Sequence, residues 1–379
     1  MTVYISGDSN SVKRDGWTKV LREHPSMHHD VQNISIGGAP SHMSLFRAMQ
    51  GLELKQGDVF VWAYGINDIL YISRANYTVD EMIWVVKQII KICSDAGAVF
   101  APLIFQPRHH SQRKHITEYR EKLHTLFDLN SIDFFDDDLT YLSENPTQKL
   151  LPISYYSDYL HYAQDAVVTD AIVNGTLDLI ARANTASISG GSLTPIKLLD
   201  TFSGGEKGLF ENSAVGKLKT WKPGPDGLKI MIPSSGRVVG LFLTTTRQGG
   251  VFDITFAGQT YTISAAFADR QFNRTMLKFI SLAAVTGAAF DCESPQEMVI
   301  AWNDCPVDVL ADHWFLKDLE PLNISGQQSC MVSVLIEDLS GPSPDNSPGA
   351  LNATASKYRN FGRWLKTTLR RPFLAAVRG

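Results

Sequence analysis

The chain has 379 residues, of which 44% are hydrophobic and 20% charged, and its formal net charge is −4. This length is ample for two hydrophobic cores, and the weak negative charge gives no overall reason to expect nucleic acid as a partner. Four widely spaced cysteines with no CxxC motif argue against a disulfide framework. No charged and apolar leader precedes the first strand pattern, and no apolar run approaches the ~18 residues that span a bilayer. We therefore expect a cytoplasmic protein.

The first 185 residues alternate between strand and helix patterns. Short apolar runs predict strands, and apolar residues at three- and four-residue spacing between them predict helices. Continuous apolar strands separated by helices indicate a parallel sheet that is covered on both faces. The predicted strands are residues 3–6, 31–36, 58–64, 98–105 and 132–135. The predicted helices are residues 17–23, 41–52, 79–96, 115–127 and 162–183.

Polar and glycine-containing clusters follow the first three predicted strands. Ligands of parallel sheets bind beyond the carboxyl ends of the strands. Ser9, in the first cluster, is a candidate nucleophile, which needs a base and donors for an oxyanion. The candidate donors are the backbone N–H groups of Ser9 and Gly38 and the side-chain amide of Asn67. The clusters are Gly7-Asp8-Ser9-Asn10, Gly37-Gly38 and Gly65-Ile66-Asn67-Asp68.

The candidate base for Ser9 is His161, just before the last predicted helix of this region. Asp158 lies three residues earlier, so its carboxylate can reach Nδ1 of the imidazole and leave Nε2 facing the nucleophile. Three alternatives stay open at this point. Asp158 caps the following helix, Asn67 only closes a turn, or Gly37 rather than Gly38 supplies the backbone donor.

These four blocks, in this order and at this spacing, resemble those of the SGNH (GDSL-type) hydrolases over residues 1 to about 185. The resemblance implies a flavodoxin-like sheet with helices on both faces. It also implies that Ser9 is the nucleophile, His161 the base and Asp158 its orienting partner. The implied oxyanion hole consists of the N–H groups of Ser9 and Gly38 and the amide of Asn67.

The sequence departs from the family pattern at two positions. Asn10 stands where an aliphatic residue usually follows the serine, and Tyr162 replaces a common proline after the histidine. Asn10 either changes how the turn packs or adds a polar group near the pocket. We treat four further residues as secondary site candidates: Asp8, Asn10, Gly37 and Asp68.

Two other kinds of cluster invite a metal interpretation. The doublets His28-His29 and His109-His110 have a spacing that does not converge on one ion, and we expect solvated loops there. Asp136-Asp137-Asp138 lacks the spacing of a calcium loop and is interpreted as a polar turn after the fifth strand. We therefore expect neither a metal nor a cofactor. Trp62, within the third strand, is expected in the core.

The composition changes after residue 185. Residues 186–195 read as a small-residue linker, and residues 196–339 carry short strand patterns typical of a jelly-roll-like β-sandwich. Such a domain either binds a glycan, with exposed aromatic residues as a platform, or completes the cleft and mediates oligomerisation. The aromatic candidates are Trp221, Tyr261, Trp302 and Trp314. The predicted strands are residues 238–246, 251–256, 259–265, 276–282 and 330–336.

The last segment, residues 340–379, combines a linker with a basic tail. On a helix, four basic residues would share one face and four apolar residues another, which indicates a basic amphipathic helix. It would bind a membrane surface at the inner face, dock on a protein partner or this chain, or extend into solvent. The basic face is Arg359, Arg363, Lys366 and Arg370, and the apolar face is Phe361, Trp364, Leu365 and Leu369.

The two halves together resemble enzymes that add or remove acetyl groups on polysaccharides. The expected function is a serine esterase that removes a small acyl group, such as acetyl, from a carbohydrate through an acyl-enzyme. One alternative is an O-acetyltransferase of polysaccharide biosynthesis with the same triad. A second alternative is a non-catalytic protein that binds glycans or acts as a scaffold.

Overall fold

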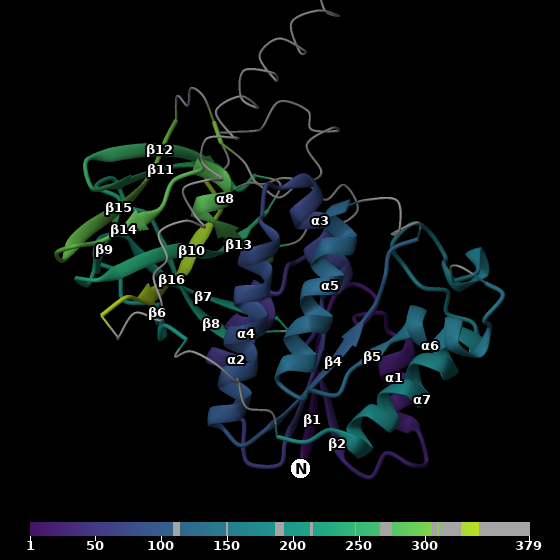
Figure 1. Ribbon diagram of the computed structural model, residues 1–379. Coiled ribbons are helices and arrows are strands. Elements are labelled where there is room, and N and C mark those ends of the chain that lie inside the picture. Colours follow the sequence, from purple (N-terminus) through teal and green to yellow (C-terminus); the bar gives the residue numbers. More distant parts are fainter. Residues whose placement is uncertain are drawn as a thin grey trace, which may run out of the picture.

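A computed structural model describes residues 1–108, 114–148, 151–185, 193–212, 215–246, 248–265, 275–304, 309–310 and 327–340 (Figure 1). Several predictions concern residues outside these ranges. They are most of the linker at 186–195, the doublet His109-His110, Trp314 and the basic amphipathic tail.

The N-terminal region is built on a five-stranded parallel sheet. Its strand order is β2-β1-β3-β4-β5, and every neighbouring pair is parallel. This is the flavodoxin-like order, in which chain direction across the sheet switches beside the first strand. The predicted fold of this region is therefore confirmed. The strands are β1 (Thr2–Gly7), β2 (Asp30–Asn33), β3 (Val59–Ala63), β4 (Val99–Ile104) and β5 (Phe135–Asp136).

Successive side chains of the strands point to opposite faces of the sheet and contribute to two hydrophobic cores, one on each face. Val3, Ile5 and Val61 pack with helices α1 (Trp17–Glu23) and α7 (Ala166–Arg182). The side chains that point the other way, including Phe60 and Trp62, pack with three further helices. These are α2 (His42–Met49), α4 (Val79–Asp95) and α5 (Lys114–Leu129). Trp62 is fully buried, as predicted.

Two helices of this region were not predicted. Helix α3 (Gly65–Arg74) begins inside the cluster that reads as a turn in the sequence, and Asp68 lies in its first turn. An acidic side chain there interacts favourably with the positive end of the helix dipole. Helix α6 (Asp137–Glu144) occupies the segment interpreted as a polar turn, so that interpretation was wrong. A short 3-10 helix, η2 (Ile153–Tyr155), precedes the loop of His161.

The described residues from 193 onward form a second domain, which we call the β domain. It contains two antiparallel sheets, whose inner faces share a third hydrophobic core. One sheet has the order β13-β10-β16-β8-β7, with β14 beside β10 and β6 beside β16. The other has the order β12-β11-β15-β9. The antiparallel β architecture is confirmed, and the finer jelly-roll-like topology stays a prediction.

All five predicted strands of the β domain are present, but six further strands and a short helix were not predicted. Strands β7 and β8 are mostly exposed and rich in charged residues, so they lack the apolar signal of a strand. The predicted strands are β10 (Gly236–Thr245), β11 (Val251–Phe256), β12 (Gln259–Ser264), β13 (Met276–Ser281) and β16 (Cys330–Asp338). The others are β6 (Ile196–Leu199), β7 (Glu206–Asn212), β8 (Gly216–Lys222), β9 (Leu228–Ile232), β14 (Phe290–Asp291), β15 (Gln296–Trp302) and helix α8 (Leu282–Thr286).

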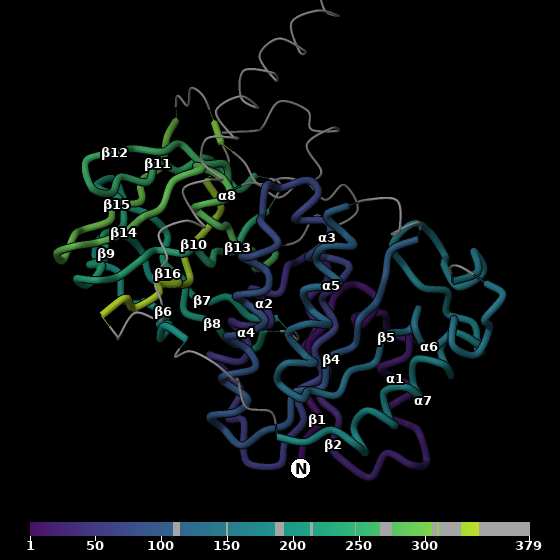
Figure 2. The backbone as a smooth tube through the Cα atoms, viewed as in Figure 1, coloured from purple at the N-terminus to yellow at the C-terminus, as the bar shows by residue number. Residues whose placement is uncertain are grey.

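The β domain packs directly on helices α2 and α4 (Figures 1 and 2). The ring of His42 stacks on Phe279 with 4.1 Å between centroids, and Phe46 lies 4.6 Å from Phe242. These contacts make one continuous hydrophobic cluster that includes residues of both domains.

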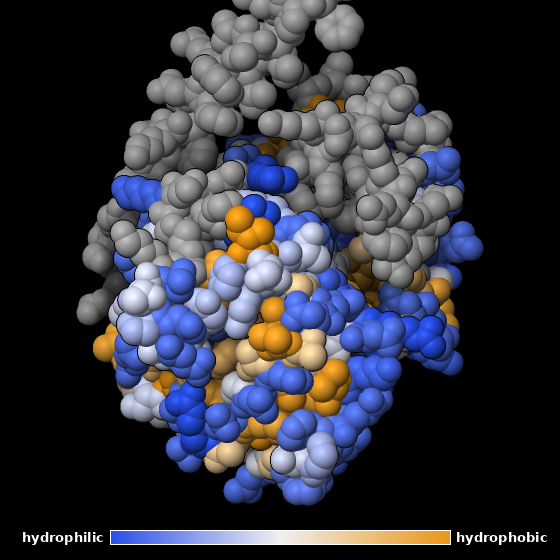
Figure 3. Space-filling view, turned by 90° about the vertical axis from the view of Figure 1, so that its right-hand side faces the viewer, coloured by the Kyte–Doolittle hydropathy of each residue, from blue (hydrophilic) through white to orange (hydrophobic). Residues whose placement is uncertain are grey.

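No helix among the described residues is both long and apolar enough to cross a bilayer. On the face drawn in Figure 3, apolar side chains lie in small groups between hydrophilic ones. Scattered apolar groups of this kind are ordinary for a protein surface.

Candidate active site

Ser9 lies in the turn that follows β1. The strand ends at Gly7, the Asp8 N–H donates to the Ala63 carbonyl at 3.0 Å, and the Ser11 N–H donates to the Asp8 carbonyl at 3.0 Å. A Cβ atom at Gly7 would lie 2.3 Å from the Ser11 Oγ, so the turn requires glycine there. The turn leaves Ser9 half-buried at the carboxyl edge of the sheet.

His161 and Asp158 lie beside Ser9, although they are about 150 residues away in sequence. His161 Nε2 is 2.8 Å from Ser9 Oγ, and His161 Nδ1 is 2.7 Å from Asp158 Oδ2. The other oxygen of Asp158 accepts hydrogen bonds from the backbone N–H groups of Leu160 and His161, both at 2.8 Å. Partial burial acts to raise the pKa of Asp158, but these hydrogen bonds outweigh it and lower the pKa below its usual value.

Asp158 does not cap the helix that follows it. Helix α7 begins at Ala166, four residues later than the predicted start, and the Asp165 side chain accepts from the Val168 N–H. Residues 157–163 instead form a loop, which is closed by a bond from the Ser157 N–H to the His161 carbonyl. The helix-capping alternative was therefore wrong.

The candidate oxyanion donors lie at neighbouring strand ends. Gly38 has a φ of 71°, and its carbonyl accepts from the Tyr71 hydroxyl at 3.0 Å. A Cβ atom at Gly37 would lie 3.4 Å from the Ser9 Cα, so this glycine approaches the serine closely. One Asn67 N–H donates to the Ala39 carbonyl at 2.8 Å, and the amide nitrogen carries a second hydrogen. Which glycine supplies the donor stays a prediction.

Two fully buried carboxyl groups, Asp8 and Asp68, hold the turns of this edge. Asp8 Oδ1 accepts from the backbone and side-chain nitrogens of Asn10 at 2.8 and 3.3 Å. Asp68 accepts from the Ser41 N–H at 2.8 Å, and from the hydroxyls of Ser41 and Tyr119 at 2.6 Å each. Burial raises the pKa of Asp8 to about 7 and that of Asp68 to about 6.

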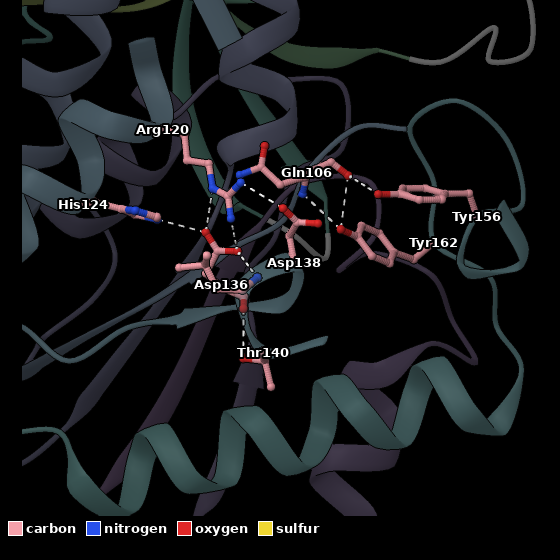
Figure 4. A network of polar contacts seen from close by, with 9 residues as sticks. Gln106, Arg120, His124, Asp136, Asp138, Thr140, Tyr156 and Tyr162 are labelled. Atoms are coloured by element: carbon pink, nitrogen blue, oxygen red, sulfur yellow. Dashed lines mark hydrogen bonds and ion pairs between the residues drawn. The ribbon is translucent and has the colours of Figure 1, made fainter. Parts of the chain in front are cut away.

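Asp136 and Asp138 bind an arginine (Figure 4). Arg120 lies 2.7 Å from an oxygen of Asp136 and 2.9 Å from one of Asp138. Asp136 also lies 2.9 Å from His124 Nε2 and caps helix α6. A compensating cation from α5 therefore allows the acidic run to be buried at a helix start, where the sequence suggested an exposed turn.

Two contacts at the site were missed in the sequence. The Asn10 side chain and the Lys13 ammonium both bind the backbone around His161, and the Lys13 Nζ donates to the Tyr162 carbonyl at 3.2 Å. The acceptor is a main-chain group 149 residues away from Lys13, and main-chain groups leave no mark in the sequence. The identity of Asn10, unusual for the family resemblance, was the one available signal.

Three of the aromatic candidates for a glycan platform pack against the core of the β domain. Trp221 is buried, and its indole N–H donates to the Asp200 carbonyl at 3.1 Å. Trp302 stacks on Phe252 at 4.3 Å, and Tyr261 packs against the same core. None of the three is exposed, so they do not favour a stacking platform.

No protein-family model and no curated protein matches this chain. Among solved structures, the chain is similar to a two-domain esterase (CEX) active on acetylated mannans, with a TM-score of 0.56 and 12% identity over 90% of this chain and 92% of that one. It is equally similar to that esterase co-crystallized with mannopentaose, at 0.56 and 11% identity over the same shares. The chain therefore shares a two-domain fold with that esterase, a parallel α/β sheet followed by a second β domain.

A further match covers only the N-terminal region. It is a member of the lipolytic protein G-D-S-L family from Veillonella parvula DSM 2008, with a TM-score of 0.39 and 14% identity over 48% of this chain and 99% of that one. Within the fold of this chain, Ser9, Gly37, Gly38 and Asn67 come from three neighbouring strand ends, and His161 reaches them from the loop before α7.

Proposed function

We propose that this protein is a serine esterase that removes a small acyl group, acetyl in the first instance, from a carbohydrate. The observation that carries the proposal is the arrangement of three side chains. His161 Nε2 lies 2.8 Å from Ser9 Oγ while its Nδ1 lies 2.7 Å from Asp158. A serine within hydrogen-bond reach of a histidine that is itself oriented by a carboxylate has the geometry of nucleophilic acyl transfer.

The proposed reaction has two halves. Ser9 Oγ attacks the ester carbonyl as His161 takes its proton, and the negative charge that develops on the oxygen is stabilised by the donors of the oxyanion hole. The C–O bond to the sugar then breaks, and His161 returns the proton to the leaving hydroxyl. In the second half, water attacks the acyl-enzyme with His161 again as the base, which releases the acid and regenerates Ser9.

The exposure of the pair supports water as the acceptor. The side chain of His161 is 30% exposed and that of Asp158 is 56% exposed. An acyl-enzyme beside so open a histidine is accessible to water, whereas a transferase has to keep water away from the acceptor position. Hydrolysis is therefore the proposed outcome, and transfer to a sugar hydroxyl is the alternative that the experiment below separates from it.

The proposed substrate class is supported by the architecture of a solved relative. A two-domain esterase active on acetylated mannans shares both domains with this chain and was also co-crystallized with mannopentaose. Identity of only 12% makes this a similarity of fold. Acetylated polysaccharides are accordingly the first substrates to test, and the mannan backbone is one member of that panel.

The first experiment measures hydrolysis of p-nitrophenyl acetate by wild type, Ser9→Ala and Ser11→Ala. We expect Ser9→Ala to lose roughly 10³-fold or more of the activity, because the nucleophile is gone. Ser11→Ala is the matched control, because it removes a buried hydroxyl two residues away that has no hydrogen-bond partner. A serine-directed phosphonate followed by peptide mass mapping should label Ser9. Equal inertness of all three proteins, with no label, would refute the esterase.

The second experiment identifies the acyl acceptor and the sugar. Acetate release is measured on acetylated mannan, xylan and simple acetylated sugars, and the glycan products are weighed by mass spectrometry in the presence of unacetylated oligosaccharides. Acetate release without mass gain on the acceptors supports the esterase. Mass gain on an oligosaccharide with little free acetate would replace it by an acetyltransferase.

A further inference from the structure

We propose that Asn10 is a positioning residue, which sets the distance between Ser9 and His161 by tying the histidine loop to the serine turn. This inference rests on the proposed esterase function and adds to it a residue that carries no chemistry of its own. The side chain of Asn10 is 4% exposed and lies between two segments that are far apart in sequence.

The carboxamide of Asn10 binds the backbone on both sides of His161. Its Nδ2 donates to the Leu160 carbonyl at 3.3 Å, and its Oδ1 accepts from the Tyr162 N–H at 2.9 Å. One planar group thereby holds the residues immediately before and after the histidine. Only a side-chain amide supplies a donor and an acceptor in this fixed relation, so neither the aliphatic residue usual at this position nor an ionised carboxylate can replace it.

The carboxamide is itself held in place from the serine side. Asp8 Oδ1 accepts from both the backbone N–H and the side-chain Nδ2 of Asn10. We call the two hydrogen bonds from the Asn10 side chain to the backbone of Leu160 and Tyr162 the clamp. Because Asp8 and Asn10 flank Ser9, the turn that carries the proposed nucleophile also carries the clamp. Any shift of the serine turn is therefore transmitted to the loop of His161.

Lys13 adds a third contact from the same segment. Its ammonium donates to the Tyr162 carbonyl at 3.2 Å and interacts electrostatically with the carboxylates of Asp158 and Asp8. The histidine loop has other attachments as well. The Arg108 N–H donates to the Tyr159 carbonyl, and the hydroxyl of Tyr162 pairs with the backbone of Gln106. Those attach the loop to the end of β4, whereas Asn10 and Lys13 attach it to the segment of the proposed nucleophile, in addition to the bond between Ser9 and His161.

The clamp matters because the histidine loop is shaped by local turn hydrogen bonds and has no regular secondary structure that would fix it relative to the serine turn. Residues 156–165 contain no helix and only one isolated bridge, between Tyr156 and Tyr162. Reacting groups have to stay within a fraction of an ångström of their productive geometry, and a displacement of about 1 Å costs on the order of 10²-fold in rate. The amide of Asn10 spans the two segments that carry the reacting atoms.

The test compares Asn10→Leu, Asn10→Asp and Lys13→Met with wild type in p-nitrophenyl acetate hydrolysis. We expect Asn10→Leu to lower kcat by about 30- to 100-fold while KM changes less than about threefold, because binding of the small ester does not use the clamp. Lys13→Met, which keeps the aliphatic stem, should lower kcat by only about three- to tenfold. Asn130→Leu is the matched control, a buried asparagine at the end of α5 whose Nδ2 donates to the Leu126 carbonyl.

Asn10→Asp gives a signature that a merely structural role would not produce. The carboxylate accepts from the Tyr162 N–H but repels both acceptors that face the amide nitrogen of Asn10, which are the Leu160 carbonyl and Asp8 Oδ1. Protonation of the new carboxylate restores a donor toward them. The ratio of its kcat to that of wild type should therefore rise as the pH falls from about 8 to about 5. A destabilised but otherwise normal enzyme would keep this ratio constant.

The outcomes separate the clamp from the esterase itself. If wild type hydrolyses the ester and Ser9→Ala does not, the esterase stands, and the Asn10 variants then judge the clamp alone. Wild-type kcat in Asn10→Leu, or a loss no larger than that of Asn130→Leu at equal thermal stability, would overturn it. If Asn10→Leu fails to fold, a flat pH ratio for Asn10→Asp together with unchanged kcat in Lys13→Met would overturn it equally.

Discussion

The two faces of the parallel sheet have different neighbours. On one face, α1 and α7 cover the strands and turn their outer sides to solvent. On the other face, α2 and α4 lie between the sheet and the β domain, and all residues of α2 from His42 to Ala48 are buried. A helix that is buried on every side has a neighbour on every side. The β domain is therefore part of the packing of the N-terminal region.

This difference bears on the active site because α2 follows the glycine turn directly. Gly37 and Gly38 precede the helix by a few residues, and Ser41, at its start, donates to Asp68. The β domain thus packs on α2, the helix that follows the Gly37-Gly38 turn of the candidate site. On the opposite face, α7 is the helix next to the candidate site, because it follows the loop that carries His161.

Removal of the β domain should have the largest effect. A chain that ends at residue 185 would expose the outer sides of α2 and α4, including Phe46. We expect insoluble protein, or a protein without esterase activity, because a large apolar surface is left without cover. Soluble expression, circular dichroism and p-nitrophenyl acetate hydrolysis measure this. A soluble, fully active fragment would contradict this expectation, because it would show that α2 and α4 need no further cover, as α1 and α7 need none.

Phe46→Ala should destabilise the whole molecule by about 3–5 kcal/mol, since it opens a cavity between the two domains where Phe46 meets Phe242. Leu21→Ala, at a fully buried position of α1 on the opposite face, is the matched comparison. With the domains unfolding as one unit, each variant lowers a single transition in differential scanning calorimetry. Two transitions, of which Phe46→Ala shifts only one, would contradict the continuous core.

Asp8→Asn should remove a pH dependence of stability. The pKa of Asp8 is raised by burial from 3.8 to about 7, so between these values the unfolded chain binds fewer protons than the folded one. Wild-type stability therefore falls as the pH rises through this window, by up to about 1.4 kcal/mol per pH unit from this group. The free energy of unfolding is measured with urea at about pH 5 and about pH 7. The value for Asp8→Asn minus that for wild type should be more favourable to the variant at about pH 7 than at about pH 5.

Asp68 is the internal reference for that measurement, since it is equally buried but accepts three hydrogen bonds, two from Ser41 at the start of α2 and one from Tyr119 of α5. Asp8 has one oxygen without a partner, and an amide fits there without a charge. A stability difference between Asp8→Asn and wild type that is the same at both pH values would contradict the raised pKa.

The smallest effect should come from Trp84→Phe at the edge of the domain contact. The Trp84 indole N–H donates to a carboxylate oxygen of the buried Glu337 at 3.3 Å, in a hydrogen bond that is only partly buried. Its loss should cost about 0.5–1.5 kcal/mol in thermal unfolding and leave activity unchanged. A loss of stability as large as that of Phe46→Ala would show that the polar edge of the domain contact stabilises the protein as much as its apolar core does.

The predictability of the elements follows their burial. Strand β11 has the predicted boundaries and helix α1 the predicted start, because buried apolar residues mark both. Helix α3 was missed because Gly65 and Asn67 are poor helix formers, and its start is stabilised by contacts with other segments. Strands β7 and β8 were missed because their side chains are mostly exposed and polar, and their pairing with each other and with β16 defines them.

The sequence alone determined the chemistry that the site offers. The types and order of Ser9, Asn67, Asp158 and His161 follow from strand ends and short spacings, which are local properties of the chain. Only the tertiary structure decided how the nucleophile and base are held together. Asn10 binds main-chain groups beside His161, and every residue has such groups, so no pattern of side chains reveals the pairing. The packing of the β domain on α2 was decided in the same way, by surfaces that meet only after both domains have folded.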